Sequence, residues 1–447
     1  MRYIPHTDRD IAAMLATLGV SSVDDLFAHL PQDLRARAAT DLPPGQSESE
    51  VRERLAALAG TNLVPPATLP FLGGGAYPHF VPAVVEQIIQ RAEFATAYTP
   101  YQPEVSQGTL QAVFEFQSLV AALLGLDVAN ASMYDGASAT AEAVLMARRI
   151  APQRPTILLA RSLHPQYRQV VRTYVEGVPG ARVTELPWGA DGRVEAAALE
   201  QRLDSTVSCV VVGYPNFFGV VEDVARISDA ARRKGALVVT VTTEAVALGL
   251  LKSPGELGAD IAVAEGQSLG MPLSYGGPGV GLFACRERFL RNMPGRLVGE
   301  TVDHEGRRGF VLTLATREQH IRRERATSNI CTNHGLCALA ATVFLCLMGK
   351  QGLRELAERN VKRSHYARDL LRQTSGHREC FAAPFFNEFV LAVPDALRVW
   401  QRLKARNLVA GLPLGGWYPE LQDCLLLCVT ELHTRADIER LARELKM

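Results

Sequence analysis

A polar turn opens directly into a predicted helix at residues 130–149, NASMYDGASATAEAVLMARR. The backbone N–H groups of Gly136, Ala137 and Ser138 stand at the start of that helix, where they have no carbonyl partner within it. Together with the Ser138 hydroxyl and the helix dipole, these groups can form a pocket for an anion such as a phosphate. Taken alone, however, small residues at a helix start favour simple capping over phosphate binding.

Three more polar side chains follow apolar runs that are typical of strands. His164 comes after TILLA, Asn216 after VSCVVVG, and Glu244 after ALVVTV. In an open α/β sheet the carboxyl ends of the strands converge on the ligand crevice, where an imidazole ring can stack on a planar cofactor. We therefore predict that these three residues and the anion turn belong to one crevice.

The stretch GADIAVAEGQSLGMPLSYGGPGVG, residues 258–281, indicates a buried strand, a polar turn and a glycine-rich loop before a second strand. A lysine in this turn could form a Schiff base with an aldehyde cofactor, but Gln267 and Ser268 stand there instead. Neither can do so, because the reaction needs a deprotonatable amine. None of the six lysines of the chain follows a buried strand; they are Lys234, Lys252, Lys350, Lys362, Lys404 and Lys446.

The elements that must position these residues form an alternating pattern from about residue 118 onward. Helical stretches alternate with short apolar runs that begin at residues 156, 207, 236, 260 and 280. Because the runs are continuously apolar, they predict a mostly parallel sheet with helices on both faces. The runs EFVLAV and LLLCVT, each with a helix close behind, predict a smaller C-terminal α+β domain.

A chain of 447 residues is long enough for two or three domains. We predict an N-terminal helical arm over residues 1–75, a large α/β domain over 76–325 and a small α+β domain over 326–447. Within the arm, Thr7 is placed to cap a first helix, with Asp10 at the third helical position.

Composition excludes several classes of function. Lys plus Arg balances Asp plus Glu, 47 against 47, so we expect no nucleic-acid or membrane partner. The longest apolar run, residues 336–348, is shorter than the roughly 20 residues that cross a bilayer, which predicts a buried helix. The first residues lack the apolar core of a signal peptide, so we expect a cytoplasmic protein. The eight cysteines contain no C-x-x-C pair, and we predict no metal site.

Several longer strings identify a family. Along the chain the anion turn comes first, then an aromatic ring, an amide and an acid, each at a strand end, and then a turn that follows a strand. This order resembles that of the fold-type I pyridoxal-phosphate enzymes. More narrowly, the chain resembles the glycine decarboxylase, or P-protein, of the glycine cleavage system, and within it the alpha subunit (subunit 1) of the two-subunit form. The strings that carry this resemblance include FLGGG, TAYTPYQPEVSQGTLQAVFEFQ, NASMYDGA, GADIAVAEGQSLG, GRLVGETVD and EGRRGFVLTLATREQHIRRERATSNICTN.

The resemblance implies a fold-type I transferase fold whose cofactor lysine lies in a homologous beta subunit, where a His-Lys pair stands at the positions of Gln267 and Ser268. It implies a heterotetramer of two alpha and two beta subunits, in which the beta subunit holds pyridoxal phosphate and the aminomethyl group of glycine passes to lipoylated H-protein. The alpha chain binds no cofactor covalently. Its own crevice is expected to be vestigial, since Glu244 stands where family alpha subunits often have aspartate.

Residues 96–108, TAYTPYQPEVSQG, are the first candidate for a functional surface. Two prolines exclude a helix and predict an extended loop that can line the tunnel for the lipoyl arm or face the partner subunit. A purely structural loop that pins the N-terminal arm is the alternative. The candidate side chains are Tyr98, Tyr101, Gln102 and Glu104.

Residues 325–335, RATSNICTNHG, are the second candidate. In fold-type I dimers a loop near this point often reaches across to the neighbour's cofactor phosphate, and Thr327, Ser328 and Asn329 are short donors suited to an anion. The alternative is that Ser328 or Asn329 caps a helix beginning near Cys331.

Two other functions remain as alternatives. One is a standalone anion-binding or regulatory protein that retains a pyridoxal-enzyme fold. The other is an autonomous enzyme that uses Lys252 on an unusual loop. Co-purification with a second chain of similar size that carries the cofactor separates these cases.

Overall fold

The computed structural model describes the chain except for residues 1–4, 39, 64–68, 331, 376 and 447. The chain divides into two compact units, residues 1–63 and 64–447. The short strand β1 (Leu69–Pro70) lies in the predicted arm, but it pairs in parallel with β13 (Leu408–Val409) of the second unit. The predicted boundaries at residues 75 and 325 stay a prediction.

The first unit consists of short helices. They are α1 (Asp8–Leu18), the 3-10 helix Val23–Phe27, α2 (Gln32–Ala38) and α3 (Glu48–Ala59). Thr7 caps α1 as predicted, because its hydroxyl accepts from the N–H of Asp10 while the Asp10 carboxylate accepts from the N–H of Thr7. Among the described residues of these four helices none is buried; Ile11 and Leu15 are partly buried, and apolar side chains such as Leu18, Leu34 and Leu55 are exposed.

A seven-stranded sheet forms the centre of the second unit, with strand order β2-β8-β7-β6-β5-β3-β4. Its strands are β2 (Val128–Ala129), β3 (Thr156–Ala160), β4 (Arg182–Leu186), β5 (Val207–Gly213), β6 (Leu237–Thr242), β7 (Ile261–Glu265) and β8 (Gly281–Cys285). Neighbouring strands pair in parallel except β8, which runs antiparallel to β2 and β7. The predicted mostly parallel sheet is confirmed.

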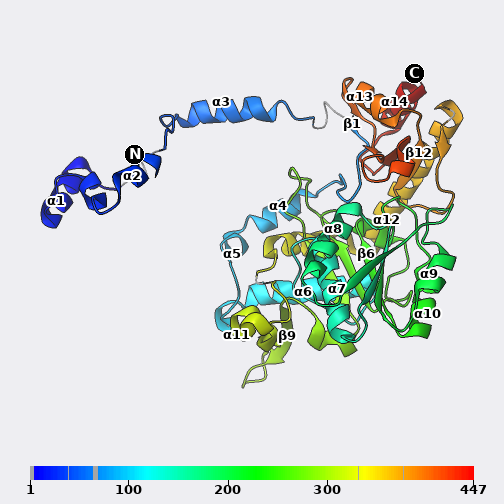
Figure 1. Cartoon of the computed structure of the whole chain (residues 1–447), viewed down its shortest axis with the longest axis horizontal. Helices are drawn as coiled ribbons and strands as arrows, with labels where there is room; N and C mark the ends of the chain where they lie inside the picture. The colour runs from blue at the N-terminus through cyan, green and yellow to red at the C-terminus, as the bar shows by residue number, and fades with distance from the viewer. Residues whose placement is uncertain (1–4, 39, 64–68, 331, 376, 447) are drawn as a thin grey trace. The chain divides into compact units, whose positions relative to one another are not determined.

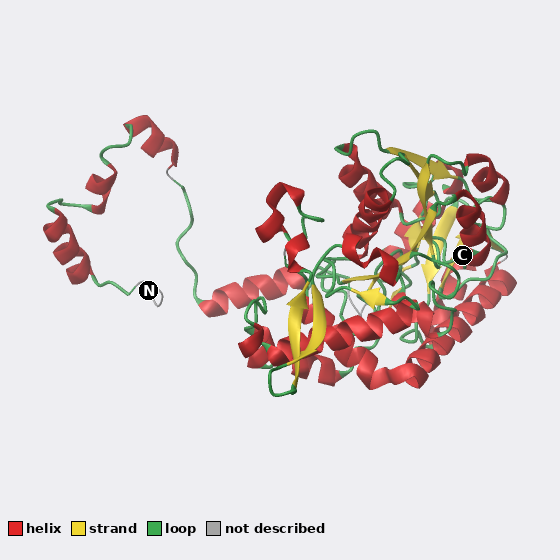
Figure 2. Cartoon of the chain, turned by 90° about the horizontal axis from the view of Figure 1, so that it is seen from below, coloured by secondary structure: helices red, strands yellow, loops and turns green. Residues whose placement is uncertain are grey.

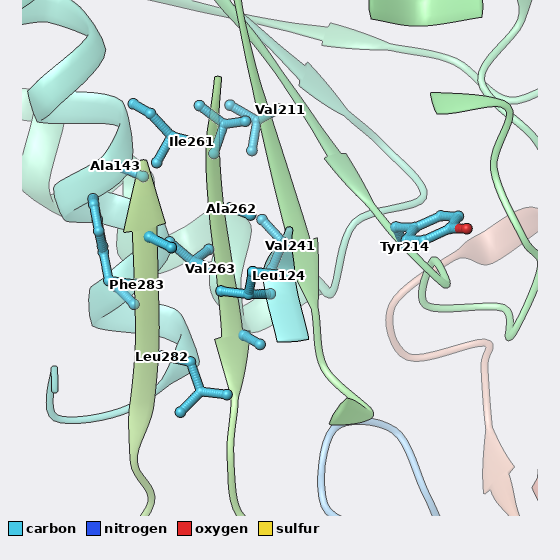
Figure 3. Packing of buried hydrophobic residues seen from close by; sticks show 14 of the residues in the cluster. Leu124, Ala143, Val211, Tyr214, Val241, Ile261, Ala262, Val263, Leu282 and Phe283 are labelled. Carbon is cyan, nitrogen blue, oxygen red and sulfur yellow. The ribbon is translucent and has the colours of Figure 1, made fainter. Parts of the chain in front are cut away.

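Helices cover the sheet, and in Figure 1 α7 and α10 lie on opposite sides of the central strands. The helices of the large α/β part are α6 (Gln107–Leu124), α7 (Gly136–Ile150), α8 (Pro165–Glu176), α9 (Ala196–Arg202) and α10 (Val224–Lys234). Because both faces are covered, every residue of β5, β7 and β8 is buried. Figure 3 shows Val241, Val263 and Phe283, from three neighbouring strands, inside this core.

A four-stranded antiparallel sheet of order β11-β12-β15-β14 forms the smaller α+β part, as predicted. Its strands are β11 (Arg378–Glu379), β12 (Glu388–Ala392), β14 (Leu412–Pro413) and β15 (Cys424–Cys428). Helices α13 (Ala396–Lys404) and α14 (Arg435–Lys446) belong to this part.

The helical stretch α12 (Gly335–Ser375) contains a kink at Gly349, whose φ of 57° is not helical. The part before the kink contains the buried helix that the apolar run at residues 336–348 predicts. Among the described residues, one segment, Gly335–Thr374, is long and apolar enough to cross a membrane by length and composition alone. Its inward side chains, such as Ala341 and Phe344, are buried in the main core, as expected for a core helix.

Several elements were not predicted from the sequence. The hairpin of β9 (Leu297–Val302) and β10 (Arg308–Thr313) is the largest, and Figure 2 shows it as a pair of strands. Much of it is exposed, so its sequence lacks the continuous apolar character of the sheet strands. Others include the sheet strands β2 and β4, the helices α4 (Ala83–Ile89), α5 (Ala92–Ala95) and α11 (Gln319–Arg322), and the 3-10 turns Pro103–Val105, Ala245–Gly249, Glu287–Asn292, Ala315–Arg317, Arg323–Arg325 and Pro419–Leu421.

Candidate functional site

The predicted crevice residues stand at the carboxyl ends of the strands, next to the segment 71–80, FLGGGAYPHF. The carbonyl oxygen of Gly74 accepts a 2.7 Å hydrogen bond from Nε2 of His164. The backbone N–H of Tyr77 donates to Oε1 of Gln267 at 2.9 Å, and Nε2 of Gln267 donates back to the Tyr77 carbonyl at 3.1 Å. A segment of the chain itself therefore occupies this edge of the sheet.

Glu244 takes part in a buried charge cluster with the same segment. Nε2 of His79 lies 2.9 Å from a carboxylate oxygen of Glu244, and Nδ1 lies 2.8 Å from a carboxylate oxygen of Glu431. Burial opposes protonation of the His79 ring, but the two carboxylates raise its pKa to about 10. Burial acts to raise the pKa of the Glu431 carboxyl, but the hydrogen bond from His79 lowers it to about 2. Glu244 is thus paired with a cation of its own chain.

The anion turn at the start of α7 holds a carboxylate from the same chain. The N–H of Gly136 donates to Oε2 of Glu265 at 2.8 Å. The Ser138 side chain and N–H instead form a capping box with Asp135, at 3.2 and 2.7 Å. The third predicted residue, Ala137, is partly buried against the main core. Anion binding and capping are therefore both present in this turn, on different residues.

The side chains of His164 and Asn216 are engaged inside the fold. The N–H of Gln166 donates to Nδ1 of His164, and burial lowers the pKa of this ring to about 4, so the imidazole is neutral. The ring packs against two aromatic rings, with centroid distances of 4.8 Å to Tyr167 in a tilted arrangement and 4.8 Å to Phe217 edge-to-face. The Asn216 amide oxygen accepts from two backbone N–H groups of its own turn, those of Phe218 and Val220, and its nitrogen donates to Glu222 and to the carbonyl of Gly192.

The position after β7 offers no amine. The Ser268 hydroxyl is buried and has no hydrogen-bond partner among the described residues. Every lysine of the chain is described, and all are exposed, namely Lys234, Lys252, Lys350, Lys362, Lys404 and Lys446. In the described part of the chain, no group of three or more His, Cys, Asp or Glu side chains is arranged to hold a metal ion.

The structure brings the two candidate loops together. The Tyr98 hydroxyl lies 3.3 Å from Oγ1 of Thr332. Both residues line a cavity of about 310 Å³ between the first loop, α6 and the start of α12, whose apolar lining includes Phe94, Pro100, Ala112, Val113 and Phe116.

The other residues of the first loop point elsewhere. The Tyr101 hydroxyl accepts from the buried guanidinium of Arg296 at 3.3 Å, while Gln102 and Glu104 are exposed. The expectation of a loop free of helix is wrong in one detail, since Pro103–Val105 form a single 3-10 turn. Proline is compatible with the first turn of a helix, where its missing N–H costs no bond.

In the second loop the capping alternative is wrong, because α12 begins at Gly335. Cys331, where the helix was expected to begin, lies outside the described residues. The Ser328 hydroxyl accepts from the N–H of Ile330 at 3.1 Å and hydrogen bonds with the Glu142 carboxyl. This bond acts to lower the pKa of Glu142, but burial has the larger effect and the pKa is raised. No side-chain hydrogen bond of Thr327 or Asn329 is found within the described part of the chain.

Sequence reasoning missed the residues that fill the crevice: Tyr77, His79 and Glu265. The three consecutive glycines of FLGGG were a usable signal, because glycine allows close backbone approach. Gly75 has a φ of 105°, and a Cβ there would lie 2.8 Å from Nε2 of His164.

The sheet order, with its single antiparallel strand, and the small α+β part define the fold as that of fold-type I pyridoxal-phosphate enzymes. Two solved structures share this fold with TM-scores of 0.63: the sphingosine-1-phosphate lyase of Burkholderia pseudomallei, at 18% identity over 91% of this chain and 92% of that chain, and a NifS-like protein, at 13% identity over 85% and 98%.

Residues 1–445 match the model of the glycine cleavage system P-protein, and the chain belongs to that family. It is 51% identical, over 100% of its length and 99% of the relative, to a probable glycine dehydrogenase (decarboxylating) subunit 1 of Desulforamulus reducens. Identity to the protein of the same name from Anaeromyxobacter dehalogenans is 54%, over 97% of each chain. A crystal structure of glycine decarboxylase (P-protein) superposes with a TM-score of 0.90, at 46% identity over 100% of this chain and 99% of that chain.

Pyridoxal phosphate does not fit the residues at this edge of the sheet. The turn after β7 carries Gln267 and Ser268 and no amine, the helix N-terminus already holds the Glu265 carboxylate, and Tyr77 is buried among the strand ends. No step of a reaction is therefore assigned to a cofactor within this chain.

Proposed function

We propose that this chain is the non-lysine, or alpha, subunit of glycine decarboxylase. With a beta subunit it decarboxylates glycine and passes the aminomethyl group to the lipoyl group of H-protein. The observation that carries the proposal is the exposure of all six lysines in a chain 51% identical to a relative named subunit 1. A fold of this class without a buried lysine needs the amine of another chain for its covalent chemistry.

The beta subunit holds the pyridoxal phosphate, which supplies the electron sink for loss of carbon dioxide. The crevice of the alpha chain is vestigial, which is supported by the pairing of Glu244 with His79 and of Gly136 with Glu265. These contacts leave neither the acid nor the helix start free for a cofactor. Two alpha and two beta chains form the working heterotetramer.

The cavity beside Tyr98 forms part of the wall along which the lipoyl arm of H-protein moves. Its aromatic and aliphatic lining suits the hydrocarbon part of that arm, and its volume of about 310 Å³ is of the size of a small-molecule site. The Tyr98 and Thr332 hydroxyls supply polar contacts at the same place.

The second loop acts in trans on the cofactor of the beta subunit. Thr327 and Asn329 carry short polar side chains on a loop that joins the strand-rich part to α12, and neither side chain is used in a hydrogen bond within the described part of the chain. Such groups are suited to donate to a phosphate. Ser328 has a structural part instead, since it bonds to Glu142.

The complex works in the cytoplasm and needs neither nucleic acid nor a membrane, in keeping with the charge balance of 47 against 47. A standalone anion-binding protein is less well supported, because Glu265 already satisfies the N–H of Gly136. An autonomous enzyme based on Lys252 is disfavoured by the exposure of that side chain.

The test is to purify the tagged chain alone and after co-expression with the beta subunit. Cofactor absorbance and the exchange of labelled bicarbonate into glycine, with lipoylated H-protein present, are measured for both. The proposal expects neither signal from the chain alone and both from the complex. Exchange by the chain alone, or a complex whose activity is the same without the alpha chain, would overturn it.

A further inference from the structure

Glu265 stands at the end of β7 with its carboxylate buried, and three backbone N–H groups from three places in the chain donate to it. Gly136, the first residue of α7, donates to Oε2 at 2.8 Å, while Gln267 and Val280 each donate to Oε1 at 3.0 Å. Helix α7 has 15 residues, so its dipole adds a positive potential at this point. Three N–H donors and a helix start form a typical binding site for an anion.

We propose that Glu265 is an internal anion, which takes the place of a phosphate at the start of α7 and closes this crevice to phosphate-bearing ligands. This inference does not depend on the reaction that the complex performs. It explains how a chain can keep the anion turn of a cofactor enzyme without leaving its N–H groups unsatisfied, since unpaired buried donors are costly.

The surroundings fit a carboxylate closely. A Cβ on Gly279 would lie 3.0 Å from each carboxylate oxygen of Glu265, and a Cβ on Gly136 would lie 2.5 Å from the Tyr167 hydroxyl. Glycine at both positions lets the backbone approach this closely. A phosphate would have to displace the Glu265 side chain and would also meet the repulsion of Asp135, whose charge acts on the same carboxyl.

The space beside the anion site is closed by the segment 71–80. Tyr77 is 1% exposed, and its N–H and carbonyl are both held by the Gln267 side chain. Gln267 thus links the segment 71–80 to the anion site, because its own backbone N–H donates to Glu265. The Glu388 carboxyl holds the same segment by accepting from the N–H of Gly74 at 2.6 Å.

The test compares Glu265→Ala with Glu222→Ala in the full-length chain. Glu222 is a matched control, because it is also buried and accepts from the backbone N–H of Val194. Burial raises the pKa of its carboxyl to about 7, as it does for Glu265. It does not lie at the start of α7. Thermal unfolding and equilibrium dialysis are measured against increasing inorganic phosphate at pH 8, above the raised pKa of both carboxyls, so that both are mainly ionised.

Glu265→Ala should unfold at a lower temperature than wild type without phosphate and regain part of the loss as phosphate is added. Its affinity for phosphate should exceed that of wild type by about tenfold or more. Glu222→Ala should lose stability without any recovery. Equal phosphate binding by wild type and Glu265→Ala, or no phosphate binding by Glu265→Ala, would overturn the proposal.

Should Glu265→Ala fail to fold, Glu265→Gln decides the question by hydrogen exchange. The amide places donors where the carboxylate had only acceptors, so one of the three N–H groups loses its partner. Peptides that contain Gly136 should exchange faster than in wild type, whereas Glu222→Gln should leave them unchanged. Unchanged protection of Gly136 in Glu265→Gln would contradict the internal-anion role.

Discussion

The Tyr77 hydroxyl donates a 2.8 Å hydrogen bond to Oε2 of Glu388, a residue 311 positions further along the chain. Both side chains are buried, and Glu388 is the first residue of β12 in the four-stranded sheet. The segment that closes the crevice is therefore fastened to both sheets, through Gln267 on one side and Glu388 on the other.

Replacing Tyr77 with phenylalanine should remove this bond and leave the ring in place. Burial raises the pKa of the Glu388 carboxyl to about 8, and loss of the phenol donor should raise it further. We expect a loss of about 1 to 3 kcal/mol in the free energy of unfolding, measured by urea denaturation. Tyr275→Phe is the control, since Tyr275 is 82% exposed and should show almost no change. Equal effects of the two substitutions would mean that the buried bond contributes nothing.

The His79 cluster predicts a pH dependence. The pKa of His79 rises from 6.5 to about 10 on folding, so its stabilisation is complete below pH 6.5 and is lost as the pH rises through 10. Glu431 has the opposite sign, because its lowered pKa of about 2 gives stabilisation that is present above pH 4.5 and lost at lower pH.

His79→Gln should therefore destabilise the protein by about 3 to 5 kcal/mol near neutral pH, because it leaves two buried carboxylates without their cation. The difference from wild type should shrink as the pH approaches 10. Urea denaturation at a series of pH values from 6 upward measures it, with exposed His304 changed to Gln as control. A difference that stays constant with pH would show that His79 is neutral in the folded chain.

The trans role of the second loop is tested by Thr327→Ala combined with Asn329→Ala in the heterotetramer. If these side chains donate to the partner's cofactor phosphate, cofactor retention and bicarbonate exchange should fall by about tenfold or more, because a charge-assisted hydrogen bond is worth roughly 1.5 to 3 kcal/mol. Assembly should persist. Ser328→Ala is the control and should lower stability alone. A double variant that keeps its cofactor and exchange rate would rule out the trans role.

The lipoyl wall is tested by filling the cavity. Ala112 lines it, whereas its neighbour Gln111 on α6 is exposed and does not. Ala112→Phe should raise the KM for lipoylated H-protein by about tenfold, the effect of losing roughly 1.4 kcal/mol of binding, while Gln111→Phe should leave it unchanged. If both variants bind H-protein as wild type does and remain assembled, the lipoyl arm passes elsewhere.

Local sequence patterns predicted most strands of the large sheet but not the closure of the site. The continuous apolar runs of β3 and β5 were predicted with their observed bounds, because burial on both faces leaves a local signature. The contact of Tyr77 with Gln267 joins residues 190 positions apart, and no periodicity within either segment indicates it. Glu265 is similar: at the end of an apolar strand it has the pattern of any strand-end acid, and only the fold places Gly136 beside it.

The start of α12 shows a different limit. Ser328 and Asn329 are good capping residues, yet the helix begins at Gly335, and just before it the Asn333 side chain donates to the Ala131 carbonyl and the Ser132 hydroxyl. Tertiary contacts here override a local capping preference. The missing lysine, in contrast, could be predicted from the sequence alone, since it depends on residue type and not on geometry.

The most direct test of the central claim is borohydride reduction of the assembled alpha–beta complex, followed by mass spectrometry of peptides from both chains. Reduction fixes the cofactor to whichever amine carries it. The account predicts a pyridoxyl group on a lysine of the beta subunit and none on Lys234, Lys252, Lys350, Lys362, Lys404 or Lys446 of this chain, all of which are exposed. A stoichiometric pyridoxyl group on any of these six lysines would contradict it.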